Sequence, residues 1–335
     1  MNAQPEKIAV IGAGSWGTAL GIQLARSGNP VALWGHLPEE IEQLARQRRN
    51  TRYLPDIDFP PLLLPEADLR AALAGAVEVL VVVPSHAFRG VLRQLKPLLD
   101  EQAGLSWATK GLEQGTSKLL HEVAAEEFGQ PARLAVLSGP TFAMEVARGL
   151  PTAIAVASSD ARRAAQLARR VHAETFRAYI SDDVIGVEIG GASKNVMAIA
   201  AGIADGLGFG ANTRAALITR GLAEIRRLGL ALGAKSDTFM GLTGIGDLAL
   251  TCTDDQSRNR RFGLALARGE GVAAAREAIG QEVEGFAASL AVYQKARALE
   301  VEMPITEQVY KVLYEGVDPH AAVHALLSRE QKVEN

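Results

Sequence analysis

The chain has 335 residues, of which 48% are hydrophobic and 22% are charged, and its formal net charge is −3. This is the composition of a soluble globular protein of about two domains, and the near-neutral charge gives no electrostatic footprint for nucleic-acid binding. The only cysteine, Cys252, excludes an intramolecular disulfide, and the lack of a long apolar run or a signal-peptide pattern predicts a cytoplasmic protein without a membrane span.

The first expected element is a short apolar strand, Ile8 to Ile11, which leads directly into the glycine-rich sequence Gly12-Ala-Gly-Ser-Trp-Gly17. Apolar residues then recur at helical spacing until Ser27-Gly28-Asn29-Pro30 ends the helix. In a G-x-G-x-x-G site the first glycine permits a tight turn, the second lets the backbone approach a pyrophosphate, and the third lets the helix pack on the strand. The pattern therefore predicts a dinucleotide-binding loop, and the alternative is a plain strand–helix turn.

A second strand, Val31 to Trp34, and a helix from Pro38 to about Arg49 follow. An NAD-specific site carries an acidic residue for the adenosine ribose about 20 residues after the glycine loop. This chain has Trp34-Gly35-His36 there, so nothing repels a 2′-phosphate and we expect NADP to be accepted as well as NAD. His36 is the candidate contact, and the nearby basic residues are interpreted as a solvated helix face: Arg46, Arg48 and Arg49.

Residues 51–65 read as a proline-rich loop in which Tyr53 is a candidate cofactor neighbour. Further strands are expected at Glu78–Val83, Leu105–Ala108, Leu134–Leu137, Ala153–Val156 and Phe176–Tyr179. Strands that alternate with helices predict an α/β N-terminal half with a Rossmann-like, doubly wound parallel sheet. Ligands bind outside the carboxyl ends of such strands. We therefore expect three segments that follow strands to lie at the same edge as the glycine loop: Pro84-Ser85, Lys110 and Gly139–Thr141.

The strand pattern stops after Ser181, and helical periodicity takes over. This predicts an all-α C-terminal domain, so that residues 1–180 form the dinucleotide-binding domain and residues 181–335 form a helical substrate and catalytic domain. Helices are expected at 182–202, 213–232, 258–269, 282–299, 304–315 and 319–328.

Lys194 stands out within the long helix because its neighbours, residues 190–199, are otherwise mostly small or apolar. A lysine is almost never fully buried without a partner. Consecutive glycines such as Gly190-Gly191 weaken a helix, and this cost suggests that something approaches the helix closely there. One interpretation is a lysine that extends to the surface. The other is a desolvated lysine with a lowered pKa that exchanges a proton with a substrate hydroxyl.

Two further segments carry polar residues suited to a small anionic substrate. Asp247 follows the glycine-rich turn Thr243-Gly-Ile-Gly246, where its carboxylate either orients a lysine ammonium or caps the next helix. Ser257-Arg258-Asn259 lies at a helix start, where N–H groups, a hydroxyl and a guanidinium can converge on a phosphate. Arg260 and Arg261 are interpreted as solvated charges.

Taken together these motifs resemble the NAD(P)-dependent glycerol-3-phosphate dehydrogenases of the bacterial type. The resemblance covers residues 7 to about 315, and its motifs come in the family order: Gly12-Ala-Gly-Ser-Trp-Gly17, Thr109-Lys-Gly-Leu-Glu113, Ser138-Gly-Pro-Thr141, Gly191-Ala-Ser-Lys-Asn195, Thr243-Gly-Ile-Gly-Asp247, Ser257-Arg-Asn259 and Val283-Glu-Gly285. It implies reversible hydride transfer between sn-glycerol 3-phosphate and dihydroxyacetone phosphate, supplying glycerophospholipid synthesis, with NADPH/NADP or NADH/NAD as cofactor and no metal. It also makes a homodimer plausible, although no residue pattern indicates an interface.

The resemblance further implies residue roles. Lys194 is the proton acceptor or donor at the C2 oxygen of the substrate. The substrate would contact Lys110, Gly139, Thr141, Lys194, Asp247, Ser257, Arg258 and Asn259. The dinucleotide would contact Gly12, Gly14, Ser15, Trp16, Gly17, His36, Tyr53, Lys110, Ala143, Arg258, Glu282 and Glu284. One departure is Ser193, where the family usually carries an aliphatic residue, and this change could alter the pKa of Lys194 or the rate.

Two other functions remain open at this point. A dehydrogenase of the same two-domain plan could act on a hydroxy acid, with the helix start at Ser257-Arg258-Asn259 binding the carboxylate. A dinucleotide sensor without chemistry would have no use for Lys194. Turnover on dihydroxyacetone phosphate, compared with turnover on small keto acids, separates the glycerol-3-phosphate enzyme from the hydroxy-acid dehydrogenase.

Overall fold

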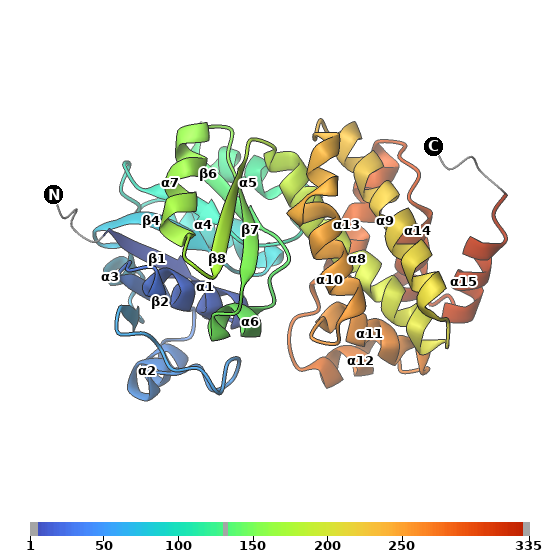
Figure 1. The fold of residues 1–335 in the computed structure, drawn as a ribbon, viewed down its shortest axis with the longest axis horizontal. Helices are drawn as coiled ribbons and strands as arrows, with labels where there is room; N and C mark the ends of the chain where they lie inside the picture. The colour runs from blue at the N-terminus through green and yellow to red at the C-terminus, as the bar shows by residue number, and fades with distance from the viewer. Residues whose placement is uncertain (1–5, 130–132, 331–335) are drawn as a thin grey trace. The chain divides into compact units, whose positions relative to one another are not determined.

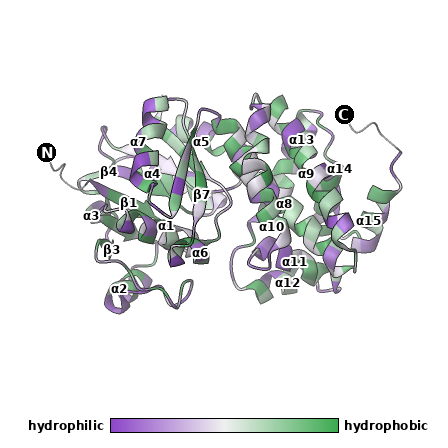
Figure 2. Ribbon diagram, in the orientation of Figure 1, coloured by the Kyte–Doolittle hydropathy of each residue, from purple (hydrophilic) through white to green (hydrophobic). Residues whose placement is uncertain are grey.

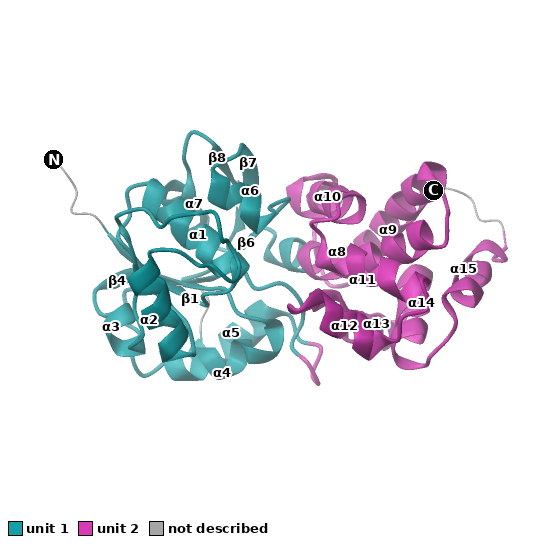
Figure 3. Cartoon of the chain, turned by 90° about the horizontal axis from the view of Figure 1, so that it is seen from below, with its two compact units in different colours: residues 1–113, 118–188 teal, residues 114–117, 189–335 magenta. Residues whose placement is uncertain are grey.

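The computed structural model describes residues 6–129 and 133–330. The chain divides into two compact units (Figure 3): residues 1–113 with 118–188, and residues 114–117 with 189–335. The last strand of the first unit, β8 (Phe176–Ser181), ends where the sequence places the domain boundary. The division between the two compact units falls later in the chain, inside helix α8 (Val184–Gly206), which begins in the first unit and continues in the second.

Within the described residues the first unit is built on an eight-stranded sheet in the order β3-β2-β1-β4-β5-β6-β7-β8 (Figure 1). Neighbouring strands are parallel except for the antiparallel pair β6 and β7. The predicted Rossmann-like, doubly wound α/β fold is therefore confirmed. Besides β8, the strands are β1 (Lys7–Ile11), β2 (Val31–Trp34), β3 (Leu63–Pro65), β4 (Ala76–Val81), β5 (Gly104–Trp107), β6 (Leu134–Ser138) and β7 (Thr152–Ala157).

Alternate residues of the central strands enter two separate cores, one on each face of the sheet. Ile8 and Val10 of β1 pack in one core with residues of α1, α6 and α7. Ala9 and Ile11 pack in the other core with α3, α4 and α5. Figure 3 shows these two helix layers on opposite sides of the strands. The helices are α1 (Ser15–Arg26), α2 (Pro38–Gln47), α3 (Leu69–Leu73), α4 (Ser85–Leu95), α5 (Leu120–Phe128), α6 (Ala143–Arg148) and α7 (Ala161–Val171).

The prediction that residues 51–65 form only loop is wrong at its end, because β3 pairs in parallel with β2 from Leu63 to Pro65. A strand of three residues that ends in proline carries almost no alternation, and proline is tolerated there because β3 is an edge strand. Figure 2 shows the hydropathy of each residue: strand β1 is mostly hydrophobic, and helix α2 is mostly hydrophilic.

The second unit is all-helical in its described part, as predicted. Its elements after α8 are α9 (Ala211–Ala231), the short turns η1 (Ser236–Met240) and η2 (Leu242–Gly246), α10 (Asp247–Thr253), α11 (Arg258–Ala267), α12 (Val272–Ile279), α13 (Glu284–Ala298), α14 (Pro304–Tyr314) and α15 (Pro319–Leu327). The turns, α10 and α12 were not expected, because segments of five to eight residues are too short to establish a helical period.

Helix α8 is the central helix of this unit, and backbone from other segments lies directly against it. A Cβ on Gly190 would stand 2.2 Å from the Thr243 carbonyl oxygen, and one on Gly202 would stand 2.0 Å from that of Arg260. The close approach predicted for the glycines is thus made at Gly190 by the chain's own backbone. By length and composition alone α8 could cross a membrane, which differs from the expectation that no apolar run is long enough, but 89% of its most apolar window is buried inside the protein.

A buried carboxylate ties α9 to the start of α14. The Glu224 oxygens accept hydrogen bonds from the backbone N–H groups of Ile305, at 2.7 Å, and Thr306, at 3.2 Å. Glu224 is 1% exposed, and this burial raises the pKa of its carboxyl group from 4.5 to about 7 despite the hydrogen bonds. Between these two pH values, therefore, Glu224 keeps its proton in the folded chain but has lost it in the unfolded chain.

We expect Glu224 to make the free energy of unfolding fall as the pH rises from about 4.5 to about 7, by at most about 1.4 kcal/mol per pH unit. Glu224→Gln cannot ionise, so its melting temperature relative to that of the unmodified protein should be higher at pH 8 than at pH 5. Thermal melts at both values measure this difference. The exposed Glu277→Gln is the control, and an equal relative melting temperature at both pH values would contradict the prediction.

Candidate functional site

The glycine loop between β1 and α1 has the geometry of a phosphate cradle. Gly12 has φ of +122°, and a Cβ there would stand 2.2 Å from the Val82 carbonyl oxygen. A Cβ on Gly17 would stand 1.8 Å from the Gly12 carbonyl oxygen, so the helix lies directly on the loop. Gly14 differs from both, because a Cβ there would have no neighbour within 4 Å. The chain's own packing explains Gly12 and Gly17, and the open space at Gly14 fits the close approach of a ligand.

The start of α1 is also suited to an anion. Its N-cap is Gly14, which supplies no side-chain hydrogen bond, and its first turn has no acidic residue. The positive end of the helix dipole is thus left without a negative charge from its own first turn. The indole nitrogen of Trp16 is buried and has no hydrogen-bond partner among the described residues. The loop, the helix start and this nitrogen all fit a bound dinucleotide.

His36 lies exposed just after β2, beside the glycine loop. A Cβ on Gly35 would stand 3.2 Å from the Ala13 Cβ, which places the end of β2 against that loop. Tyr53 is half-buried, and the Arg52 guanidinium lies 5.2 Å from the centre of its ring. The contact of His36 and Tyr53 with the adenosine end of the cofactor stays a prediction.

The neighbouring arginines have structural partners. Arg46 lies 3.6 Å from Glu42 on the exposed face of α2, and Arg49 pairs with Asp58 at 2.7 Å. The prediction that Arg48 is solvated is wrong, because its guanidinium donates to three carbonyl oxygens: those of Phe59 and Pro60 in the loop before β3, and that of Leu63 at the start of β3. The reason is the left-handed conformation of Arg48, with φ of 52°, which ends α2 and turns the side chain inward.

The structure brings together three of the residues predicted at the carboxyl edge of the sheet. Lys110 Nζ donates to the Gly139 carbonyl oxygen at 3.4 Å, and Thr141 Oγ1 donates to the same oxygen at 3.3 Å. Lys110 follows β5 and Gly139 follows β6, and these strands pair in parallel. Ala143 begins the next helix, α6. An ammonium, a hydroxyl and a carbonyl thus converge at one edge, where they can bind a polar ligand.

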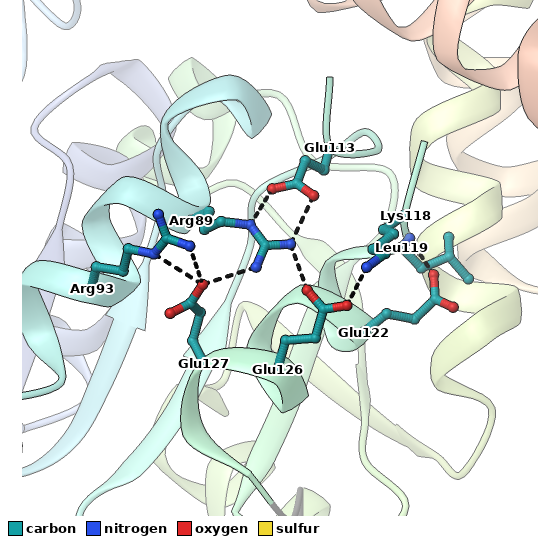
Figure 4. A network of polar contacts seen from close by, with 8 residues as sticks. All are labelled: Arg89, Arg93, Glu113, Lys118, Leu119, Glu122, Glu126 and Glu127. Carbon is teal, nitrogen blue, oxygen red and sulfur yellow. Dashed lines mark hydrogen bonds and ion pairs between the residues drawn. The ribbon is translucent and has the colours of Figure 1, made fainter. Parts of the chain in front are cut away.

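A charged network on α4 and α5 holds the far end of the loop that carries Lys110 (Figure 4). Arg89 of α4 binds both oxygens of Glu113, at 2.5 and 2.8 Å. The same guanidinium reaches Glu126 at 2.7 Å and Glu127 at 2.8 Å on α5. These bonds hold the pKa of Arg89 above its ordinary value. Since Glu113 lies three residues after Lys110, the network restricts where that loop can lie.

In the helical unit Lys194 is buried, with 7% of its surface exposed, and it is paired. Its Nζ forms an ion pair with Asp247 Oδ1 and donates to Thr251 Oγ1 at 3.1 Å. Thr251 in turn donates to the Asp247 backbone carbonyl oxygen at 2.6 Å. Lys194 therefore does not extend into solvent. Thr251 was missed by sequence reasoning, although its place one helical turn after Asp247 was a usable signal.

The turn before α10 explains how Asp247 reaches Lys194. Gly246 N–H donates to the Gly241 carbonyl oxygen at 3.2 Å, which is a π-type turn, and Gly244 within it has non-helical dihedrals. A Cβ on Gly244 would stand 2.0 Å from the Phe239 carbonyl oxygen, so only glycine permits this close approach. Asp247 is the first residue of α10 and fully buried, while the N-cap is Gly246. Its carboxylate pairs with the Lys194 ammonium.

A second hydrogen-bond network surrounds the next residue, Asn195. Its Nδ2 donates to Glu284 Oε2 at 3.1 Å, and its Oδ1 accepts from Asn259 Nδ2 at 2.9 Å. Asn259 Oδ1 accepts from Gly285 N at 2.9 Å, so both ends of its amide have protein partners. Two predicted site residues, Asn259 and Glu284, thus join α11 and α13 to α8. Asn195 was missed as a candidate, and its place directly after Lys194 was the available signal.

The start of α11 is capped by Ser257, whose Oγ accepts from Arg260 N at 3.2 Å. Arg258 follows at the first helical position, half-buried, with its Nη1 3.4 Å from Gln281 Oε1. The prediction that Arg260 is a solvated charge is wrong. Arg260 is 8% exposed and forms ion pairs with Asp205, at 2.7 Å, and with Asp255. Helical periodicity turns it inward, whereas Arg261 is exposed as predicted.

Two small residues near Lys194 have no polar role of their own. Burial raises the pKa of the Cys252 thiol to about 12, so it stays protonated and is no nucleophile at neutral pH. Ser193 is fully buried, and its hydroxyl has no hydrogen-bond partner among the described residues.

Glu282, the remaining predicted cofactor contact, is half-buried just before α13.

Two family models match almost the whole chain. The model of the NAD-dependent glycerol-3-phosphate dehydrogenase N-terminus matches residues 7–164, and that of the C-terminus matches residues 183–324. The chain belongs to the NAD-dependent glycerol-3-phosphate dehydrogenase family. Within it, the chain is 59% identical over 335 residues to glycerol-3-phosphate dehydrogenase [NAD(P)+] of Pseudoalteromonas translucida, with both chains fully covered. It is also 59% identical to the enzyme of that name from Thioalkalivibrio sulfidiphilus, over 98% of each chain.

Among solved structures, glycerol-3-phosphate dehydrogenase from Coxiella burnetii superposes with a TM-score of 0.94. That protein is 50% identical, and the match covers 97% of this chain and 99% of the other. Family membership accounts for the order of elements described above, from the glycine loop of β1 to the helical unit that carries Lys194.

Proposed function

We propose that this chain carries out the NAD(P)-dependent interconversion of sn-glycerol 3-phosphate and dihydroxyacetone phosphate, with Lys194 as the proton acceptor or donor. The reaction is that of its family, and it supplies glycerol 3-phosphate for glycerophospholipid synthesis. The observation that carries the role of Lys194 is its burial against Asp247 and Thr251. A buried ammonium that is held by a carboxylate and a hydroxyl is fixed in position, as proton transfer requires.

In the reductive direction the C2 oxygen of dihydroxyacetone phosphate develops negative charge and needs a proton. The dihydronicotinamide, when bound, supplies the hydride to C2. The Lys194 ammonium donates the proton to the C2 oxygen, and in the oxidative direction its amine takes that proton back. Asp247 stabilises the ammonium form and keeps it oriented. General acid–base assistance of this kind contributes about 10²- to 10⁴-fold in rate.

The substrate needs an anion site as well as a proton donor. We assign its phosphate to the start of α11, where Arg258 and the N-terminal N–H groups follow the cap residue Ser257. Lys110 polarises the substrate carbonyl, and Gly139 and Thr141, which meet Lys110 at the Gly139 oxygen, help to hold the substrate. The other residues of the substrate set are Asp247 and Asn259; Asn259 acts by holding Asn195 in place.

The dinucleotide is assigned to the α/β unit. Its pyrophosphate fits the glycine loop and the start of α1, at Gly12, Gly14, Ser15, Trp16 and Gly17. The adenosine ribose fits beside His36, with Tyr53 as a neighbour. The remaining proposed contacts are Lys110, Ala143, Arg258, Glu282 and Glu284. We propose further that the protein is cytoplasmic and forms a homodimer.

The activity is tested by mixing the purified protein with dihydroxyacetone phosphate and following the oxidation of NADH and, separately, of NADPH. We expect turnover with both cofactors, because His36 stands where an NAD-specific site has a carboxylate. Small keto acids serve as the control substrates and should give no comparable turnover. Turnover on keto acids alone would favour a hydroxy-acid dehydrogenase, and oxidation of NADH with NADPH inert would contradict the assignment of the ribose pocket.

A further inference from the structure

One buried side chain outside the proposed contact set lies directly against the glycine loop. Asn50 comes after α2 and is 2% exposed. Its Nδ2 donates to the Ala13 carbonyl oxygen at 3.0 Å and to Thr18 Oγ1 at 2.8 Å. Thr18 Oγ1 donates to the same Ala13 oxygen at 3.3 Å. A carbonyl oxygen can only accept, so the nitrogen of the amide must be the atom that faces Ala13.

The turn that follows α2 holds Asn50 in this place. The Asn50 carbonyl oxygen accepts from Leu54 N at 2.8 Å and from Tyr53 N at 3.3 Å. The preceding residue, Arg49, pairs with Asp58 across an isolated bridge. These backbone bonds hold the Asn50 main chain in place. Its side-chain amide nitrogen donates one hydrogen bond to the glycine loop and one to α1.

The direction of the Ala13 carbonyl determines the direction of the next N–H. The peptide bond is planar and trans, so the Ala13 C=O and the Gly14 N–H point in opposite directions. Since Asn50 and Thr18 both bind the Ala13 oxygen, the Gly14 N–H is turned away from them. Gly14 is also the glycine beside which a Cβ would meet no atom within 4 Å. The N–H that Asn50 orients therefore belongs to the open part of the loop.

We propose that Asn50 is a positioning residue for the cofactor pyrophosphate, which acts by holding the Ala13–Gly14 peptide in its anion-binding orientation. The proposal rests on the dinucleotide role assigned above. It predicts an effect shared by NADH and NADPH, since the two cofactors have the same pyrophosphate and differ only at the ribose 2′ position. The chemistry also requires an amide here, because a carboxylate would face the Ala13 oxygen without a proton to donate and would place negative charge beside a phosphate site.

The test is equilibrium titration of the Asn50→Asp variant with NADH and with NADPH, followed by nicotinamide fluorescence and without substrate. We expect both Kd values to rise by the same factor, about tenfold or more, as for the loss of hydrogen bonds around a charged group. Once the cofactor is saturating, kcat and the KM for dihydroxyacetone phosphate should stay near those of the unmodified protein. A loss of general stability alone would not produce this pattern.

Asn29→Asp is the matched control. Asn29 lies at the other end of α1, and its Nδ2 also donates to two acceptors, the carbonyl oxygens of Leu24, at 2.9 Å, and Arg170, at 3.0 Å. This variant should lower the melting temperature without changing either Kd. If Asn50→Asp does not fold, Thr18→Val removes the hydroxyl that bonds both the Asn50 amide and the Ala13 oxygen, and both Kd values should again rise together.

Two results would overturn the role of Asn50: unchanged Kd values in a folded variant, or a rise for NADPH alone, which would place the effect at the ribose. Neither result bears on the proposed reaction, because binding is measured without turnover. Conversely, failure of the unmodified protein to reduce dihydroxyacetone phosphate would reject the reaction and leave the binding test of Asn50 intact.

Discussion

Lys194→Ala should lower kcat by about 100-fold or more and leave the affinity for NADH and NADPH nearly unchanged. The physical reason is that the variant lacks the group that exchanges a proton with the C2 oxygen, while the glycine loop and the start of α1 are untouched. Steady-state kinetics in both directions, together with cofactor titration, measure the two quantities separately. Near-normal kcat would reject Lys194 as the acid and base.

This variant needs a control for stability, because it leaves the fully buried Asp247 without its ammonium. Breaking a buried ion pair in this way costs about 3–5 kcal/mol. The double variant Lys194→Met with Asp247→Asn removes both charges and nearly preserves the two side-chain shapes. We expect it to recover much of the lost melting temperature but not the lost kcat. Recovery of kcat in the double variant would show that the unpaired carboxylate, and not the missing proton donor, caused the loss.

Arg258→Ala should raise the KM for dihydroxyacetone phosphate by about 10- to 100-fold, because a hydrogen bond to a charged group contributes about 1.5–3 kcal/mol. The value of kcat at saturating substrate should change much less, since the phosphate is remote from the bond that reacts. Among the described residues, the Arg258 guanidinium has a single hydrogen bond, a long one to Gln281 at 3.4 Å, so its removal breaks no strong structural bond with them. Steady-state kinetics with the substrate varied at saturating cofactor measure the effect.

Arg261→Ala is the matched control for this prediction. Arg261 lies three residues further along α11 and is exposed, so its removal takes away the same charge from the same helix. It should leave KM for the substrate unchanged. An equal rise in both variants would show a general electrostatic effect, and no rise in Arg258→Ala would remove Arg258 from the phosphate site. A rise in the KM of the cofactor alone would assign Arg258 to the dinucleotide.

The strands and long helices could be predicted because their burial leaves a local mark. The β-branched runs of β1 and β4 are buried on both faces, and α9, α11 and α14 keep a regular helical period. The elements that were missed are short. β3 has three residues and α12 has eight, so neither is long enough for a periodic pattern to emerge.

The residue types of the site were also visible in the sequence, but their partners were not. Asp247 could be read as a helix cap or as a partner of Lys194, because local sequence permits both. The choice depends on a turn in which Gly244 lies against the backbone of Phe239 and directs the next helix toward α8. In the same way Arg260 reads as one of several surface arginines until the positions of Asp205 and Asp255 are known.

The sequence by itself determined the class of this protein, since the glycine loop, the strand–helix alternation and the order of the motifs are all local features of the chain. The tertiary structure alone decided which side chains meet. Lys194 and Asp247 are 53 residues apart in the chain, and Asn50 is 37 residues from Ala13. Hydrogen bonds depend on distances of about 3 Å between atoms, and only the packed fold sets such distances between residues that are remote in sequence.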